Sequence, residues 1–448
     1  MTSRKKVIVL GLGIEGLSLV KYFSKNYEVS VFDEKVESDI EKQATEAVKG
    51  YGAKLYLGNI KKLPKFDIIA RSPAVRPDYP LISKLTKKGS LLTSATKIFF
   101  NICKGEIIGV TGTKGKGTTC TLIYKLLKTQ YNNVHLAGNI GIPMLDILPK
   151  IKKSSKVVLE LSSFQLMDLG KSPHIAVALM ATSEHLNWHK DQNEYLKAKS
   201  NISKYQNTTD YAVINADFPK SIKLTKETKA KKYFFSTTKE TNGVYVKSNN
   251  IISAIGEQER VCTATEVLLP GRHNLQNVLA SCTVAKIYGI TSSNIRKVLK
   301  NFKGLEHRLQ LVATKEGVKY YNDSFSTIPE TTIAAMEAFN GPKILVLGGS
   351  SKNSDFRKLI NKIETTSTVK NIVLIGKESI RIKGLIKDDR TRKKIITGLN
   401  SMAEVVTKCK NLSKSGDIVL LSPACASFDM FKNYKDRGNQ FIKAVNLL

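Results

Sequence analysis

The chain has 448 residues, 42% of them hydrophobic, which predicts a folded protein of about three domains. Its 71 basic and 38 acidic residues give a net charge of +33, a balance that alone would suit a nucleic-acid-binding protein. The basic residues are instead scattered as Lys-Lys pairs without a basic stripe interleaved with aromatic residues, so a solvated surface is favoured and no nucleic acid partner is expected.

Cysteine usage and hydropathy favour a cytoplasmic protein. The six cysteines form no C-x-x-C pair and have no histidine at a spacing suited to zinc, which is typical of a reducing cytosol. The apolar run at residues 7–10 breaks at Gly11 and has no cleavage site after it, so we interpret it as a strand rather than a signal peptide. No apolar stretch approaches the roughly 20 residues that span a membrane, so no membrane contact is expected.

The N-terminal segment has the pattern of a Rossmann-like domain. A strand at 5–10 leads into Gly11-Leu12-Gly13-Ile14-Glu15-Gly16, a helical pattern continues to Phe23, and a strand at 28–33 ends on Asp33. This G-x-G-x-x-G turn can bind a nucleotide diphosphate, with Asp33 in the place usual for a ribose contact. A further strand at 66–70 runs into Ser72-Pro73, and we predict a first domain at residues 1–94.

A second glycine-rich loop opens the central segment. The apolar run at 106–110 precedes Thr111-Gly112-Thr113-Lys114-Gly115-Lys116-Gly117-Thr118, and a helix is predicted over 120–127. Strand, glycine loop and helix favour a phosphate site, with Lys116 near the outer phosphates and Thr118 as the nearest hydroxyl for magnesium. Val110 and Gly117 depart from the G-x-x-x-x-G-K-[ST] pattern, so a turn in a lysine-rich protein is the alternative.

Strands and helices alternate through the rest of the chain. Apolar runs at 156–163, 175–182 and 210–215 are typical of buried parallel strands, short β segments follow at 231–268, and helices are predicted at 274–288 and 294–300. Four more strands are predicted at 318–322, 343–347, 371–375 and 417–421. The predicted fold is α/β with mostly parallel sheets: a Rossmann-like domain (1–94), a P-loop-type central ATPase domain (95–303) and a Rossmann-like C-terminal domain (304–448).

Polar side chains stand at the ends of the central strands, where doubly wound sheets bind ligands. Glu160 ends one strand and would need a cation, while His185 follows the next strand and can bind a metal as a neutral imidazole. Lys199 lies on the helix that follows, and Asn139 lies in a turn after a short strand. Taken singly, His185 is more readily interpreted as a structural histidine and Lys199 as a solvated surface lysine.

Taken together, these motifs resemble the Mur ligases, the ATP-dependent amide ligases of peptidoglycan precursor synthesis. The resemblance is carried in order by residues 112–116, 138–141, 160–165, 184–189, 195–199, 271–277, 306–308 and 322–324, and so covers nearly the whole chain. Residues 348–356 and 422–434 resemble the branch of the family that adds D-glutamate, and the D-N-P-R motif of the diamino-acid-adding branch is missing.

The resemblance implies a reaction and a set of residues. ATP would phosphorylate the alanyl carboxylate of UDP-N-acetylmuramoyl-L-alanine, and D-glutamate would attack the acyl phosphate, with two Mg²⁺ ions, a carbamylated Lys199 and a monomeric enzyme. The implied catalytic residues are Lys116, Asn139, His185 and Lys199, and the implied metal ligands are Thr118, Glu160, His185 and Lys199. The implied ATP site is Gly112, Thr113, Lys114, Gly115, Lys116, Gly117, Thr118, Asn277, Arg308 and Asp323. The implied UDP-substrate site is Ile14, Glu15, Gly16, Asp33, Ser72 and Asn139, and the implied amino-acid site is Thr327, Lys352, Ser427, Phe428 and Tyr434.

Four residues depart from the family pattern: Gly117 for Ser or Thr, Ala74 for glycine, Phe325 for lysine and Tyr434 for phenylalanine. Because the last two lie near the implied amino-acid site, L-glutamate stays an alternative substrate. A folylpolyglutamate synthase is disfavoured by the G-x-G-x-x-G domain, which that relative lacks. A basic nucleic-acid-binding ATPase is the alternative from a different class.

Overall fold

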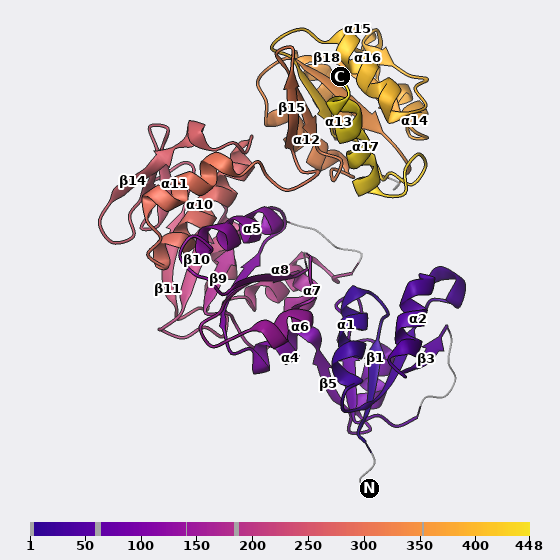
Figure 1. Cartoon of the computed structure of the whole chain (residues 1–448), viewed down its shortest axis with the longest axis vertical. Coiled ribbons are helices and arrows are strands. Elements are labelled where there is room, and N and C mark those ends of the chain that lie inside the picture. The colour runs from indigo at the N-terminus through magenta and orange to yellow at the C-terminus, as the bar shows by residue number, and fades with distance from the viewer. Residues whose placement is uncertain (1–3, 59–63, 140, 183–187, 352–353) are drawn as a thin grey trace. The chain divides into compact units, whose positions relative to one another are not determined.

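The computed structural model describes residues 4–58, 64–139, 141–182, 188–351 and 354–448. These residues form three mainly parallel sheets and one small antiparallel sheet, which confirms the predicted α/β class. The chain divides into two compact units (Figure 1). The first unit contains residues 1–264 and 276–298, and the second contains residues 265–275 and 299–448.

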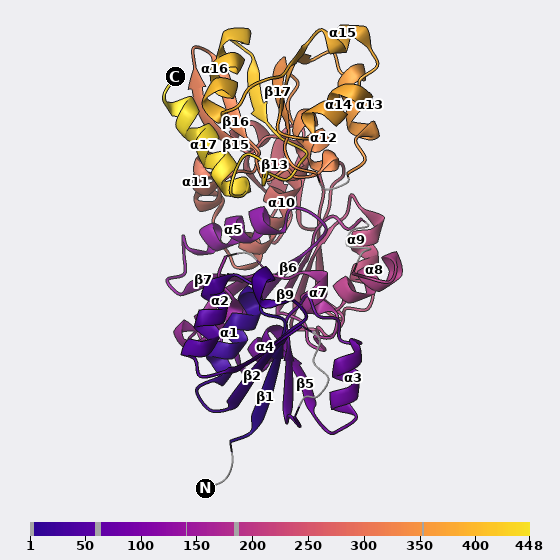
Figure 2. The same cartoon turned by 90° about the vertical axis from the view of Figure 1, so that its right-hand side faces the viewer.

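The first sheet is fully parallel, with strand order β3-β2-β1-β4-β5. Alternate residues of β1 point to opposite faces: Val7 and Val9 pack against α1 and α2, whereas Ile8 and Leu10 pack against α3 (Figure 2). The elements are β1 (Lys6–Leu10), α1 (Ile14–Phe23), β2 (Glu28–Asp33), η1 (Glu37–Asp39), α2 (Lys42–Gly50), β3 (Lys54–Leu57), β4 (Ile68–Arg71), α3 (Pro80–Thr86) and β5 (Leu91–Ser94).

The second sheet is also parallel, with order β11-β10-β9-β6-β8-β7, and a small antiparallel sheet, β12-β13-β14, follows it in the chain. Its strands are β6 (Glu106–Thr111), β7 (Val134–Gly138), β8 (Lys156–Glu160), β9 (Ile175–Ala178), β10 (Tyr211–Asn215) and β11 (Lys231–Phe235); the small sheet has β12 (Val244–Lys247), β13 (Asn250–Ser253) and β14 (Glu259–Thr263). The helices are α4 (Ala95–Ile102), α5 (Lys116–Leu127), α6 (Met144–Ile147), η2 (Leu148–Lys150), α7 (Ser163–Leu166), α8 (Gln192–Ser200), α9 (Pro219–Leu224), η3 (Ala264–Glu266), α10 (Arg272–Ile287) and α11 (Ser292–Asn301).

The first and second sheets share a hydrophobic core. Leu19 and Val20 of α1 belong to the same buried cluster as Phe99 of α4 and Met144 of α6. This packing explains why residues 1–94 and the central segment fall in one compact unit. The first sheet ends at Ser94, but the predicted domain boundary there stays a prediction.

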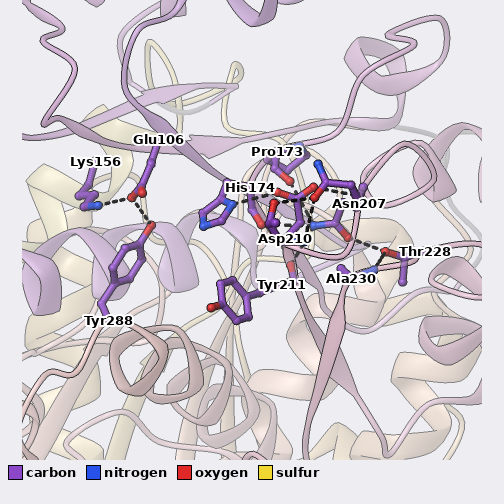
Figure 3. Close-up of polar contacts among 12 residues, drawn as sticks. Glu106, Lys156, Pro173, His174, Asn207, Asp210, Tyr211, Thr228, Ala230 and Tyr288 are labelled. Carbon is purple, nitrogen blue, oxygen red and sulfur yellow. Dashed lines mark hydrogen bonds and ion pairs between the residues drawn. The ribbon is translucent and has the colours of Figure 1, made fainter.

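Charged and aromatic side chains close the amino-terminal edge of the second sheet (Figure 3). Glu106, at the start of β6, pairs with Lys156 at the start of β8 and accepts a hydrogen bond of 3.2 Å from the Tyr288 hydroxyl. His174, just before β9, forms a hydrogen bond of 2.9 Å between its Nδ1 and Oδ1 of Asp210, just before β10. In a parallel sheet the glycine loops emerge at the opposite, carboxyl edge, so we assign these contacts a structural role.

The last sheet has order β15-β16-β20-β17-β18-β19 and is parallel except for the β15–β16 hairpin. Its core is split in two: one cluster packs α12, α13 and α14 on one face, and the other packs α16 and α17 on the opposite face (Figure 2). Its elements are β15 (Gln310–Lys315), β16 (Val318–Asn322), α12 (Pro329–Glu337), β17 (Lys343–Gly348), α13 (Arg357–Thr365), β18 (Val369–Ile375), α14 (Ser379–Leu385), α15 (Asp389–Arg392), β19 (Ile395–Ile396), α16 (Met402–Leu412), β20 (Ile418–Leu421) and α17 (Tyr434–Asn446).

Two sequence predictions on thiols and hydropathy can be checked against the described residues. All six cysteines are free thiols in the structure. None of the helices in the described ranges combines the length and apolar character needed to cross a lipid bilayer.

Close packing between α17 and the start of the last domain gives a prediction about stability. A Cβ at Gly438 would lie 2.2 Å from Nδ1 of His307, whose ring is held by a 3.0 Å hydrogen bond with Asn322. Gly438→Ala should therefore destabilise the second unit by about 1–3 kcal/mol, despite the higher helix propensity of alanine. Hydrogen exchange of α17 measures this loss.

Gly384→Ala is the matched control, because Gly384 also lies in a helix but a Cβ there would meet open space. This substitution should leave stability unchanged or raise it by up to about 1 kcal/mol. Equal exchange rates in the two variants would contradict the predicted clash.

Candidate active site

The glycine loop between β6 and α5 is shaped by close approaches that only glycine permits. A Cβ at Gly112 would lie 2.7 Å from Cβ of Leu179, and one at Gly115 would lie 2.1 Å from Oδ1 of Asn277. Gly115 also has φ +86°, a left-handed conformation that favours glycine. The predicted ATP-site residue Asn277 thus lies directly beside the loop.

Helix α5 begins at Lys116 rather than at the predicted Cys120, because Gly115 supplies the left-handed residue before it. The first-turn amides of α5 therefore belong to residues 116–119, which include Gly117 and Thr118. This places a helix N-terminus, with its partial positive charge, at the end of the loop. The Lys116 ammonium donates to the carbonyl oxygens of Gly112 and Thr113 at 3.1 and 3.2 Å, so it lies over the loop.

Helix α8 supports the loop through two side chains one turn apart. Lys199 is only 2% exposed, and its Nζ lies 2.9 Å from the carbonyl oxygen of Gly112 and 3.3 Å from Oγ1 of Thr111. Tyr195 places its hydroxyl 2.9 Å from Oγ1 of Thr113. The isolated reading of Lys199 as a solvated surface lysine is therefore wrong.

The β7–β8 register brings Asn139 and Glu160 together. Gly138 pairs with Glu160 across the sheet, and the Asn139 side-chain amide donates to Oε1 of Glu160 at 2.9 Å. Glu160 also pairs with Val110, which leads into the glycine loop. A buried carboxylate at this edge is an oxygen donor of the kind that Mg²⁺ prefers.

The predicted metal site is only partly visible. Thr118, Glu160 and Lys199 lie on α5, β8 and α8, respectively, but His185 lies outside the described residues. The described ranges hold no group of three His, Cys, Asp or Glu side chains placed to bind a metal ion. The carboxylate and hydroxyl oxygens among these residues fit a hard cation such as Mg²⁺.

The G-x-G-x-x-G turn is held by side chains from neighbouring strands. Ser72 donates its hydroxyl to the carbonyl oxygen of Gly11 at 2.7 Å, and Oδ2 of Asp33 accepts from the backbone N–H of Leu12 at 2.7 Å. A Cβ at Gly16 would lie 2.0 Å from the carbonyl oxygen of Gly11. Asp33 and Ser72 thus shape the turn whether or not they also contact a ligand.

Glu15 connects this turn to the central segment. Its Oε1 accepts a hydrogen bond of 2.5 Å from Nε2 of Gln165, which lies just past Glu160 in the chain. Burial raises the pKa of Glu15 to about 7, although Gln165 and Arg71 favour the charged form. Ile14, which precedes Glu15 in the implied UDP-substrate site, is 74% exposed to solvent.

Charged residues that the sequence analysis missed hold the loop after β4 against the central segment. Arg71 is fully buried and donates to the carboxylate of Asp168 and to the carbonyl oxygen of Phe164. Arg76 donates two hydrogen bonds to the carboxylate of Glu194, from Nη2 to Oε1 at 2.9 Å and from Nη1 to Oε2 at 3.0 Å. This pairing lowers the pKa of Glu194 to about 2. The sequence did offer one signal: Arg71 ends an apolar strand. A charge buried there needs a partner, so the position of Arg71 could have predicted this contact.

The candidate residues of the last domain meet at the carboxyl end of β16 and β20. Oδ2 of Asp323 accepts from the hydroxyls of Ser326 and Ser422 at 2.5 and 2.8 Å, and Oδ1 accepts from the N–H of Leu309 at 3.1 Å. Burial nonetheless raises the pKa of Asp323 to about 7. The Arg308 guanidinium lies 3.8 Å from the ring centroid of Phe325, the residue that replaces a lysine of the family pattern.

The predicted amino-acid residues are distributed unevenly around this end of the sheet. Ser427 is buried, Phe428 is 74% exposed, and the Tyr434 ring contacts Phe325 edge-on at 5.1 Å. Thr327 follows the turn that contains Ser326, at an intermediate exposure. Lys352 lies outside the described residues.

Profiles of known families match all three segments in order. The profile described as "Mur ligase MurD-like, N-terminal domain" matches residues 5–94, "Mur ligase middle domain" matches 110–285, and "Mur ligase, glutamate ligase domain" matches 307–425. Together these profiles cover most of the chain.

Full-length relatives and a solved structure agree with the profiles. The chain is 39% identical to a UDP-N-acetylmuramoylalanine–D-glutamate ligase of Clostridium tetani, covering 99% of this chain and 97% of that protein. It is 40% identical to a protein of the same name from Acetivibrio thermocellus, covering 99% and 96%. A UDP-N-acetylmuramate–alanine ligase from Thermotoga maritima shares the fold, with a TM-score of 0.59 and 16% identity over 99% of both chains.

The loop geometry predicts that Gly115→Ala weakens nucleotide binding. The left-handed backbone should cost alanine about 1–2 kcal/mol, and the clash with Asn277 adds displacement of the loop. We expect ATP affinity to fall by at least about tenfold. Titration with a fluorescent ATP analogue measures the affinity, and thermal unfolding measures the strain.

Gly256→Ala separates these two effects. Gly256 has φ +77° but open space around its Cβ position, so alanine there should carry the backbone strain without the clash. This control should bind ATP like the parent protein. Unchanged ATP binding by Gly115→Ala would show that the loop does not hold the nucleotide.

Proposed function

The chain belongs to the Mur ligase family, and we propose that it is the ATP-dependent ligase that joins D-glutamate to UDP-N-acetylmuramoyl-L-alanine in peptidoglycan precursor synthesis. The observation that carries this proposal is the 38–40% identity, over 99% of the chain, to four ligases that bear this name. The site supports it, because the glycine loop, Glu160, Asn139 and Lys199 gather at one edge of the second sheet.

The reaction proceeds in two steps. The γ-phosphoryl group of ATP passes to the alanyl carboxylate, giving an acyl phosphate and ADP. The amine of D-glutamate then attacks the acyl carbon, loses its proton, and expels inorganic phosphate as the amide forms. The first step brings two anions together, so the site must supply positive charge and hydrogen-bond donors.

The residues of the central segment supply that charge. Lys116 holds its ammonium over the loop, and the first-turn amides of α5 point toward the same place. Asn139 would donate its amide to the charge that develops on the acyl group, once it leaves Glu160. Gly112, Thr113, Lys114, Gly115, Gly117, Thr118 and Asn277 would complete the nucleotide site, with Arg308 and Asp323 from the last domain.

Two Mg²⁺ ions, held by Thr118, Glu160, His185 and a carbamylated Lys199, would offset the repulsion between the phosphates and the carboxylate. Carbamylation joins the Lys199 amine to CO₂ with loss of a proton, which turns a cation into an oxygen ligand. This modification gives a function to a lysine that is buried against the glycine loop.

The remaining residues bind and orient the other substrates. Ile14, Glu15, Gly16, Asp33, Ser72 and Asn139 would hold the UDP-linked substrate, whose diphosphate suits the G-x-G-x-x-G turn. Thr327, Lys352, Ser427, Phe428 and Tyr434 would hold D-glutamate, with Lys352 and Ser427 facing its carboxylates. Because each substrate contributes a reacting atom, all three must be bound before chemistry. We expect the enzyme to act as a cytoplasmic monomer.

The proposal predicts a strict three-substrate requirement. Phosphate release should need ATP, UDP-N-acetylmuramoyl-L-alanine and D-glutamate together, because each contributes a reacting atom. L-glutamate and a diamino acid should react at least about tenfold more slowly, since their α-carboxylate or side chain would be misplaced. A coupled phosphate-release assay measures the rates. Preference for L-glutamate or a diamino acid would overturn the assignment of the substrate.

The carbamate proposal predicts that Lys199→Ala loses at least about 100-fold in activity and that a short carboxylate such as formate restores part of it. Labelling with ¹³C-bicarbonate should give a carbamate resonance in the parent protein but not in this variant. Lys197→Ala is the control, because Lys197 lies on the same helix but is exposed, and it should remain active. Full activity of Lys199→Ala without added carboxylate would rule out the carbamate.

A further inference from the structure

Arg437 is a buried arginine of the last domain that none of the family's motifs singled out. It lies near the start of α17, four residues after the N-cap residue Asn433, and has no exposed surface. A cation near a helix N-terminus opposes the helix dipole, and burial of a charge is costly. Burial lowers the pKa of Arg437 to about 10, so the guanidinium remains charged at neutral pH.

The guanidinium connects two separate segments of the chain. Nε donates to the hydroxyl of Ser324 at 2.9 Å and Nη2 donates to the carbonyl oxygen of the same residue at 2.9 Å. Nη1 donates to the carbonyl oxygens of Cys425 and Ala426 at 3.2 and 3.1 Å, and Nη2 also reaches Cys425 at 3.2 Å. Among the described residues, its acceptors are thus carbonyl and hydroxyl oxygens.

A third segment is attached to the same carbonyl group. The oxygen of Ala426 also accepts from the N–H of Ser350 at 2.9 Å, and the Ser350 hydroxyl accepts from the N–H of Phe428 at 3.1 Å. A Cβ at Gly349 would lie 2.1 Å from the Ala426 oxygen and 3.2 Å from Nη1 of Arg437. The turn after β17 therefore packs directly on the segment that Arg437 holds.

The segment from Ala424 to Phe428 needs such support, because it is strained. Ala424 has φ +59°, a left-handed conformation that costs a residue with a Cβ roughly 1–2 kcal/mol. Strained residues persist only where their surroundings fix them from several sides. Here the N–H of Ala424 donates to the carbonyl oxygen of Ser326 at 2.9 Å, and Arg437 fixes the next two carbonyl groups.

These three segments carry the residues to which the proposed function assigns the amino-acid substrate. Ser324 precedes Thr327, Ala426 precedes Ser427 and Phe428, and Ser350 precedes Lys352 in the chain. We propose that Arg437 is the positioning residue of the amino-acid site: its guanidinium sets the three segments in one arrangement and so determines the affinity for the incoming amino acid, without touching it. This inference rests on the proposed function for the identity of the amino acid.

Arg437→Lys tests the inference, because lysine keeps the charge but lacks the planar set of donors that reaches Ser324, Cys425 and Ala426. We expect the KM for D-glutamate to rise on the order of 10- to 100-fold while the KM for ATP stays within about twofold. Hydrogen exchange of residues 424–428 should become faster, and that of the β-sheet core should not. Arg437→Ala should regain part of its D-glutamate affinity when guanidinium chloride is added at millimolar concentration.

Two further variants make the result decisive. Arg71→Lys removes an equally buried guanidinium from the other unit and should leave both the exchange of residues 424–428 and the KM for D-glutamate unchanged. If Arg437→Lys does not fold, Ser324→Ala removes the acceptor of Nε, together with the 2.8 Å hydrogen bond from this hydroxyl to the carbonyl oxygen of Tyr434. This variant should raise the KM for D-glutamate to a smaller degree.

Exchange of residues 424–428 at the parent rate, or equal increases in the KM values for D-glutamate and ATP, would overturn the positioning role. Failure of the proposed function would look different: the parent protein itself would release no phosphate in response to D-glutamate, while the change in exchange would persist.

Discussion

The register of the second sheet is the constraint on which the candidate site depends. Val110 and Gly138 both pair with Glu160, so the glycine loop and the Asn139 turn emerge on either side of the same carboxylate. Because all strands of this sheet are parallel, their carboxyl ends meet at one edge. A shift of β8 by one residue would turn Glu160 to the opposite face and separate it from Asn139.

Buried charges attach loops to this framework at two places. Arg71 and Arg437 are both fully buried, and each donates to backbone carbonyl oxygens of a loop near candidate site residues. Removing a guanidinium from water costs several kcal/mol, which hydrogen bonds only partly offset. Arg71 has the carboxylate of Asp168 and so forms a clamp, whereas Arg437 holds a strained segment through neutral acceptors. The same donor group therefore forms an ion pair in one place and supports a strained backbone in the other.

Local sequence patterns predicted the strands and the glycine loops but not the tertiary environment of single residues. The buried inner parallel strands were found because they are apolar throughout. The edge strands β3 and β5 were missed because they are partly exposed, and β15 was missed because its mixed exposure gives a mixed pattern. Helix α5 was predicted too short, since Gly117 lowers helix propensity and only the conformation of Gly115 reveals the true start. Lys199 and Arg437 resemble any solvated cation in the sequence. Only the motif context pointed to Lys199, and nothing in the sequence pointed to Arg437.

The replacement of a family lysine by Phe325 changes the surroundings of Arg308. A lysine there would place a second cation beside Arg308, whereas the aromatic ring accepts the Arg308 guanidinium at 3.8 Å from its centroid. Tyr434, the other departure in this region, supports the ring of Phe325 edge-on at 5.1 Å. Compared with the family pattern, this region has one positive charge fewer, but the orientation of the Arg308 guanidinium is fixed by the ring of Phe325. An arginine that is already ordered loses less entropy when it binds an anion. If Arg308 binds the nucleotide as proposed, the two aromatic residues would compensate through preorganisation for the charge that the lysine would have supplied.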